Sequence, residues 1–256
     1  MSHKQISHAG MALALLLVSS DSWSATTLVA VAANFSKPMT EIAAEFEKAS
    51  GHTAKLSFGS SGKFVSQIEN GAPFEVLLSA DDKGPQKLLK AGLAQVNTQF
   101  TYALGKLVLW SAKPGYVDGQ GKILTGGGFK HLALADPKLA PYGAAAIDVL
   151  KGLNLQEQLS PIFVLGENIA QAYQFISTGN AELGFVALSQ VIVNGKIATG
   201  SGWIVPSDQH SPIRQDAVLL SKGAENPAAG ALLDYLKSAP ALAIIQKYGY
   251  DLAGQK

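Results

Sequence analysis

Short apolar runs alternate with helical patterns along most of the chain, starting at Thr26. The run TLVAVAA has the composition of a buried strand, and the segment after it places Met39, Ile42, Ala43 and Phe46 on one face of a helix. The same order repeats with AKLSF and FEVLLSA, each followed by a helical pattern. Such alternation is typical of an α/β protein with mostly parallel sheets and helices on both faces.

The pattern restarts beyond a polar stretch near Thr98. This second series contains helical segments at 142–151 and 169–177 and the strand-like runs LGKLVLW, HLALAD, PIFVL and ELGFVAL. Two series within one chain of this length indicate two α/β lobes. Because no low-complexity linker separates them, we expect the chain to cross between the lobes more than once.

The composition excludes several classes of protein. Lys and Arg number 20 against 19 Asp and Glu, for a net charge of +1, and no long basic run occurs. The electrostatic signature of a nucleic-acid or anionic-membrane partner is therefore absent. With no cysteine, the chain cannot use a thiol nucleophile, an iron–sulfur cluster or a disulfide.

The amino terminus has the pattern of an export signal. Lys4 precedes an apolar run, Ala9 to Val18, and Ser22-Trp23-Ser24 offers small residues for cleavage. The run is too short for the roughly 20 residues of a membrane-spanning helix. Residues 1–24 are therefore predicted to be a cleaved signal peptide, so that the mature protein is exported without a membrane segment.

The segment LSFGSSGKF, Leu56 to Phe64, has some features of a nucleotide-binding phosphate loop. The pattern G-x-x-x-x-G-K-[ST] requires glycine where Ser57 stands and a hydroxyl residue where Phe64 stands, so the motif fails. A strand that enters Gly59–Gly62 at a helix start still presents free N–H groups and a positive helix end to an anion. The alternative is that Ser60 and Ser61 only cap this helix.

Three other predicted strands also lead into a helix start. Asn34 or Ser36 could cap the first helix, Pro141-Tyr142-Gly143 opens another, and Asn168 begins a capping-box-like sequence. In an open parallel sheet such starts share the carboxyl edge, where these folds bind ligands. The four turns offer amides, hydroxyls and one phenol, which suit a fully ionised oxyanion that only accepts hydrogen bonds.

Several separated segments carry a family resemblance as a set: VAVAANFSKPM, LSFGSSGKF, GAPFEVLLSAD, ADPKLAPYG, GENIAQA and IIQKYGY. Together they resemble the periplasmic molybdate-binding proteins of ATP-driven importers, over about residues 26–252. The resemblance implies a two-lobed type II periplasmic binding protein that closes on molybdate or tungstate and delivers it to the membrane permease of an ABC importer. It also implies a periplasmic monomer that carries no cofactor.

Matched position by position, the resemblance implies a set of oxyanion ligands. They are the amide of Ala33 with Asn34, then Ser61, Tyr142, and the backbone amide of Ile169. No direct metal ligand is implied, because molybdate is bound through its oxygens.

The sequence departs from the family pattern at one position. Some members have a ligand tyrosine where this chain has Ala187, and a small residue where it has Tyr142. The resemblance therefore leaves open which residue is the donor in the second lobe. The resemblance also implies lobe boundaries: residues 25–103 with 216–256 form one lobe, and 104–215 form the other.

Other functions are less well supported by the residues. An enzyme would need a nucleophile with its base, but no G-x-S-x-G motif occurs and His52, His131 and His210 stand in unrelated contexts. A cation site would need paired His or Cys ligands. A sulfate-binding or other small-oxyanion protein stays the closest alternative, because cavity dimensions decide between such anions.

Overall fold

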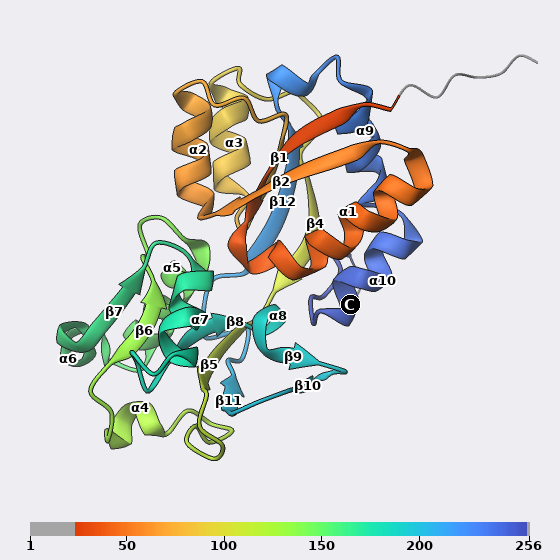
Figure 1. Cartoon of the computed structure of the whole chain (residues 1–256). Coiled ribbons are helices and arrows are strands. Elements are labelled where there is room, and N and C mark those ends of the chain that lie inside the picture. The colour runs from red at the N-terminus through yellow and green to blue at the C-terminus, as the bar shows by residue number, and fades with distance from the viewer. Residues whose placement is uncertain (1–23, 255–256) are drawn as a thin grey trace, which may run out of the picture.

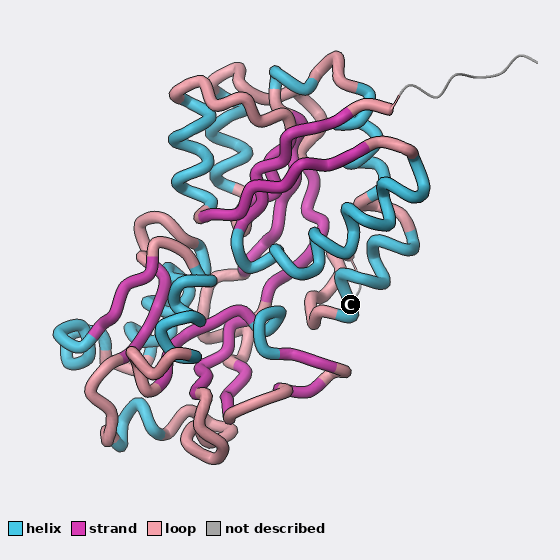
Figure 2. The backbone as a smooth tube through the Cα atoms, viewed as in Figure 1, coloured by secondary structure: helices cyan, strands magenta, loops and turns pink. Residues whose placement is uncertain are grey.

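Two sheets of five strands each organise the molecule, and the computed structural model describes residues 24–254 of the chain (Figure 1). We call each sheet with the helices packed on it a lobe. Figure 2 shows the strands gathered into two separate groups, with the chain passing between them. The predicted signal peptide lies outside the described residues except for Ser24, whose hydroxyl donates to the carbonyl of Gly51 at 2.8 Å.

The first lobe contains both ends of the described chain. Its sheet has the order β2-β1-β3-β12-β4. These strands are β1 (Thr26–Ala32), β2 (Thr53–Gly59), β3 (Val76–Ser79), β4 (Phe100–Gly105) and β12 (Ile213–Leu219). The helices are α1 (Ser36–Ser50), α2 (Ser61–Glu69), α3 (Lys83–Lys90), α9 (Pro227–Tyr235) and α10 (Ala239–Lys247), with the 3-10 turns η1 (Ala33–Phe35) and η3 (Ser221–Gly223).

Side chains on the two faces of this sheet belong to different cores. Val29 and Val31 of β1 pack with α1, α9 and α10, whereas Ala30 packs with α2 and α3 on the opposite face. The alternation follows from the two-residue period of a strand. Figure 1 shows α2 and α3 on one side of the sheet and α1, α9 and α10 on the other. Helix α1 buries Met39, Ile42 and Phe46, as predicted from their spacing.

The second lobe is built around a sheet with the order β11-β5-β8-β6-β7. These strands are β5 (Leu107–Ser111), β6 (Leu132–Ala135), β7 (Phe163–Gly166), β8 (Leu183–Ala187) and β11 (Ser201–Ile204). The helices are α4 (Ile123–Gly126), α5 (Pro141–Gly152), α6 (Gln156–Leu159), α7 (Ile169–Ser177) and α8 (Leu188–Val191), with η2 (Ser160–Ile162). A small hairpin joins β9 (Ile192–Val193) and β10 (Lys196–Ile197).

Helices cover both faces of the second sheet. Leu107 and Leu109 of β5 belong to a core that includes α5, whereas Val108 and Trp110 belong to a core that includes α7. The ring of Trp110 stacks on Tyr173 of α7 with 5.2 Å between ring centroids.

The α/β architecture with two lobes confirms the predicted fold class, but both sheets are mixed. β1 pairs in parallel with β2 and β3, and β6 pairs in parallel with β7 and β8. β12 runs antiparallel to β3 and β4, and β5 runs antiparallel to β8 and β11. In each sheet one strand therefore runs against the rest: β12, which carries the chain back into the first lobe, and β5, which carries it into the second.

The chain crosses between the sheets twice. It leaves the first sheet at Gly105, enters the second at Leu107, leaves that sheet at Ile204 and re-enters the first at Ile213. The run LGKLVLW, predicted as one strand, is therefore divided between β4 and β5. Among residues 24–254, no single helix is long and apolar enough to cross a membrane; only α9 and α10 together reach that length, with a bend of 62°.

Candidate functional site

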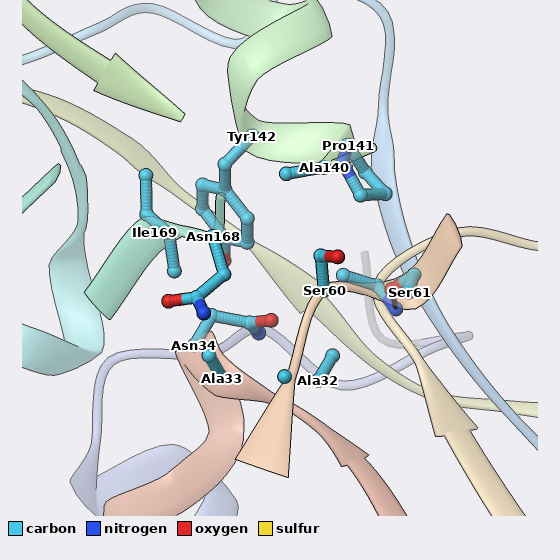
Figure 3. Close-up of a pocket in the computed structure, with 12 residues that line it drawn as sticks. Ala32, Ala33, Asn34, Ser60, Ser61, Ala140, Pro141, Tyr142, Asn168 and Ile169 are labelled. Carbon is cyan, nitrogen blue, oxygen red and sulfur yellow. Dashed lines mark hydrogen bonds between the residues drawn. The ribbon is translucent and has the colours of Figure 1, made fainter. Parts of the chain in front are cut away.

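A small pocket lies between the lobes, where four strands end and the next helices begin (Figure 3). It has about 200 Å³ of space not filled by atoms, part of which is continuous with solvent. The lining residues are Ala32, Ala33, Asn34, Gly59, Ser60, Ser61, Ala80, Ala140, Pro141, Tyr142, Asn168 and Ile169.

The first turn, η1, places two helix-start residues in the pocket lining. Ala33 and Asn34 begin this helical turn, so their N–H groups have no partner within it. The prediction that Asn34 or Ser36 caps the first helix is wrong, because neither side chain makes a capping bond. The carboxamide Nδ2 of Asn34 is used elsewhere, donating to Gln215 Oε1 at 2.7 Å and to the Tyr250 hydroxyl at 2.9 Å.

The second turn supplies two buried hydroxyls at the start of α2. Ser61 is 1% exposed, and its Oγ accepts a hydrogen bond of 2.9 Å from the Ala80 N–H, which leaves the hydroxyl proton free to donate. Ser60 is 2% exposed, makes no side-chain cap, and its Oγ has no partner among the described residues. Neither serine side chain caps α2, so the alternative that Ser60 and Ser61 only cap this helix is wrong.

The third turn places Tyr142 in the pocket wall. The ring lines the pocket, and the phenol oxygen is buried without a hydrogen-bond partner in the described part of the chain. A Cβ on Gly105 would collide with this oxygen, so the phenol rests on the backbone of β4 at the lobe crossing. Burial raises the pKa of Tyr142 well above its usual value, and the nearby Tyr250 adds to this, so the group stays a protonated donor.

Gly143 allows the third helix start to reach the pocket. Its position approaches β6 so closely that a Cβ would collide with the carbonyl oxygen of Ala135. Tyr142 stands second in α5, after Pro141, so its backbone N–H also lacks a partner within the helix.

The fourth turn is a fully capped helix start. Asn168 Oδ1 accepts the N–H groups of Ala170 at 3.0 Å and Gln171 at 3.2 Å. Ile169, the first residue of α7, has no helical partner for its N–H. Since the Asn168 side chain satisfies the next two donors, the Ile169 amide is the one left to face the pocket.

Every lining residue of the pocket is uncharged. An ion pair between residues close in sequence to lining residues joins the lobes: Lys63 Nζ lies 2.9 Å from Glu167 Oε2, with the two side chains 49% and 37% exposed. Lys63 is thus paired with an acidic residue that directly precedes the fourth turn. Within residues 24–254, no group of three His, Asp or Glu side chains is placed to hold a metal ion.

The lobes also touch directly beside the pocket. The N–H of Gly62 in α2 donates to the carbonyl of Leu139 in the second lobe at 2.9 Å. This amide is therefore already bonded, and the donors that α2 offers are the Ser60 and Ser61 hydroxyls with the Ser61 N–H.

All five residues predicted as oxyanion ligands line this one pocket: Ala33, Asn34, Ser61, Tyr142 and Ile169. Their role in binding stays a prediction. Sequence reasoning did not select Ser60, whose buried hydroxyl also lines the pocket, although two adjacent serines at one helix start were a signal because only one position can cap. Ala187 is not a lining residue; it ends β8 within the same hydrophobic core as Tyr142.

Comparisons with known proteins agree on one family. A model of the bacterial extracellular solute-binding proteins matches residues 27–251. The molybdate-binding protein ModA of Azotobacter vinelandii is 58% identical over 247 residues, covering 96% of this chain and 98% of the relative. ModA of Rhodobacter capsulatus is 56% identical over 223 residues, covering 87% of each chain.

A solved structure is similar over the same extent. The periplasmic molybdate-binding protein of Azotobacter vinelandii superimposes with a TM-score of 0.86 at 44% identity, covering 88% of this chain and 99% of that one.

Proposed function

Because the chain belongs to the family of bacterial extracellular solute-binding proteins, we propose that it captures molybdate in the pocket between its lobes for an ABC importer. Tungstate, which has the same charge and shape, is the second expected ligand. The relatives named above are binding proteins, so the chain is a transport component and not an enzyme.

One observation carries this proposal: four helix starts converge on a pocket whose lining is entirely neutral. A fully ionised tetrahedral oxyanion only accepts hydrogen bonds, and the pocket supplies donors from backbone N–H, serine and phenol groups. The positive ends of the helix dipoles add to the attraction. A protonated anion such as hydrogen phosphate also donates, and it would need an acceptor that the Lys63-bound Glu167 does not offer.

The proposed donors come from both lobes. The first lobe contributes the N–H groups of Ala33 and Asn34 with the Ser61 hydroxyl, to which we add Ser60 because its buried hydroxyl is unpartnered. The second lobe contributes Tyr142 and Ile169. A guest that binds both sets stabilises the closed arrangement of the lobes, with the crossings as the hinge.

We further propose the finer features that the family suggests. The lobes are residues 25–103 with 216–256 and residues 104–215, and each moves as a unit. The protein is exported by cleavage of residues 1–24, acts in the periplasm as a monomer, and engages the importer's permease. It needs neither a cofactor nor a nucleic-acid partner.

Sulfate is the alternative guest, because it shares the charge and shape of molybdate but is smaller. The volume of the pocket therefore decides between them. Calorimetric titration of the mature protein with molybdate, tungstate and sulfate tests the proposal. We expect tight binding of the first two and weak binding of sulfate. Equal or stronger affinity for sulfate would overturn the assignment.

A further inference from the structure

A buried polar cluster lies directly behind the first turn of the pocket. Its members are Asn34, Ser189, Gln215 and Tyr250, all at most 4% exposed. Only Asn34 lines the pocket. Asn34 and Tyr250 belong to the first lobe, Gln215 lies in the strand that re-enters it, and Ser189 lies in α8 of the second lobe.

Three segments converge on Asn34. Its carbonyl oxygen accepts the Ser189 hydroxyl at 2.8 Å and lies 2.9 Å from the Tyr250 hydroxyl. Its carboxamide Nδ2 donates to Gln215 and to the Tyr250 oxygen, so both of its protons are used. The Tyr250 and Ser189 hydroxyls are themselves 3.1 Å apart, which closes the cluster around this residue.

Hydrogen bonds to the backbone carbonyl and from the side chain of Asn34 hold this turn in place. The Asn34 N–H has no partner within the turn, and it can be aimed at an anion in the pocket only while this turn keeps its orientation. Preorganised donors bind a charged group better because they need no rearrangement when the ligand arrives.

From this geometry we infer that Tyr250 and Ser189 are positioning residues of the anion site. Ser189 couples closure of the lobes to the orientation of the Asn34 turn. The inference rests on the proposed function for the identity of the anion. Tyr250 holds the turn from within its own lobe. Ser189 reaches the same carbonyl from the other lobe, so its bond to Asn34 exists only while the lobes are together.

The chemistry of Tyr250 suits this role over a wide pH range. Burial raises the pKa of its phenol to about 12, so the hydroxyl remains protonated at neutral pH. Its ring is fixed independently by an edge contact with Phe35, with 5.3 Å between ring centroids. Removal of the hydroxyl alone should therefore leave the ring in place.

The test compares Tyr250→Phe and Ser189→Ala with two matched controls. Tyr248→Phe removes a phenol two residues away, whose hydroxyl bonds Glu41 outside the cluster at 3.0 Å. Ser177→Ala removes an exposed hydroxyl that bonds only within its own helix region, to the Gln174 carbonyl. Stopped-flow measurement with molybdate gives association and dissociation rates for each protein.

We expect each cluster variant to release molybdate about 5- to 10-fold faster, with the association rate nearly unchanged. The controls should match the unmodified protein. In the double variant, the dissociation rate should increase by less than the product of the two single increases, because both hydroxyls act on one carbonyl. Unchanged dissociation rates, or fully multiplicative effects, would overturn the inference.

A second measurement needs no ligand. Amide hydrogen exchange over residues 33–39 of the ligand-free protein should be faster in Tyr250→Phe than in Tyr248→Phe, because the turn has lost its support. If the unmodified protein fails to bind molybdate, the proposed function falls, while this comparison still decides whether Tyr250 holds the turn. Equal exchange in both variants would contradict the positioning role.

Discussion

The starts of α2 and α7 face the same pocket but use their polar residues in opposite ways. At α7, the Asn168 side chain accepts hydrogen bonds from two backbone N–H groups, so the donor left for the pocket is a backbone amide. At α2, Ser60 stands in the equivalent N-cap position and makes no capping bond, so the pocket receives hydroxyls. A polar residue before a helix can therefore either cap the helix or offer its hydrogen-bond donor to the ligand. We expect loss of the first role to lower stability and loss of the second to lower affinity.

The largest expected effect on binding comes from Ser61→Ala. The variant loses a donor to the anion, which is worth roughly 1.5–3 kcal/mol, or a 10- to 150-fold weaker affinity. It also leaves the Ala80 N–H without its acceptor, so the ligand-free protein should melt at a lower temperature. Calorimetric titration and thermal melting measure both, with the exposed Ser66→Ala on the same helix as the control. Unchanged affinity would mean that Ser61 serves only the protein.

Ser60→Ala separates ligand binding from stability. Its hydroxyl has no protein partner, so the variant should bind molybdate about tenfold more weakly while the ligand-free melting temperature stays the same or rises. The same two measurements apply. A clear loss of stability without a loss of affinity would mean that Ser60 stabilises the helix and does not bind the anion.

Asn168→Ala should show the opposite balance. Loss of a capping side chain costs about 0.5–2 kcal/mol of stability, so melting shifts down in the ligand-free protein. The affinity should fall by less than in Ser61→Ala, since the Ile169 N–H itself remains. If Asn168→Ala lost as much affinity as Ser61→Ala while its melting temperature stayed that of the unmodified protein, Asn168 would bind the anion and not cap the helix.

Lys63→Ala tests the ion pair that joins these two regions. Both side chains are partly exposed, so the pair is worth at most about 1 kcal/mol, and molybdate release should accelerate no more than about fivefold. The difference from the unmodified protein should shrink at high salt. Lys87→Ala, which breaks a surface pair with Glu69 away from the pocket, is the matched control. A much larger, salt-independent effect would mean that Lys63 contacts the anion.

The smallest expected effect is that of pH between 7 and 9. The pocket has no charged lining, and burial raises the pKa of Tyr142 and Tyr250 above their usual values. A tyrosine with a raised folded-state pKa contributes stability that is fully present below its unfolded value, near 10, and is lost as pH rises through the folded value. Affinity measured across this window should therefore be constant, and a steep change would reveal a titrating group at the site.

The helical periods and the helix starts could be read from the chain because they are local. Helix α7 begins and ends at the predicted residues, 169 and 177, since its apolar face and its cap lie within one short segment. The end of β4 was merged with β5 into one predicted strand, β11 was not recognised, and the mixed direction of the sheets was missed. Strand pairing depends on partners far away in the chain, such as β12 between β3 and β4, which no local pattern records.

The sequence by itself determined that an α/β chain has four strand-to-helix turns rich in neutral donors, because spacing and residue type are local properties. Only the tertiary structure decided which donors are free. Asn34, Ser60, Ser61 and Asn168 are all polar residues at helix starts, yet the packing of distant segments uses the carboxamide of Asn34 and leaves the hydroxyl of Ser60 unpaired. The physical reason is that a donor hydrogen bonded to one acceptor is not available to another, and only the fold brings the possible acceptors together.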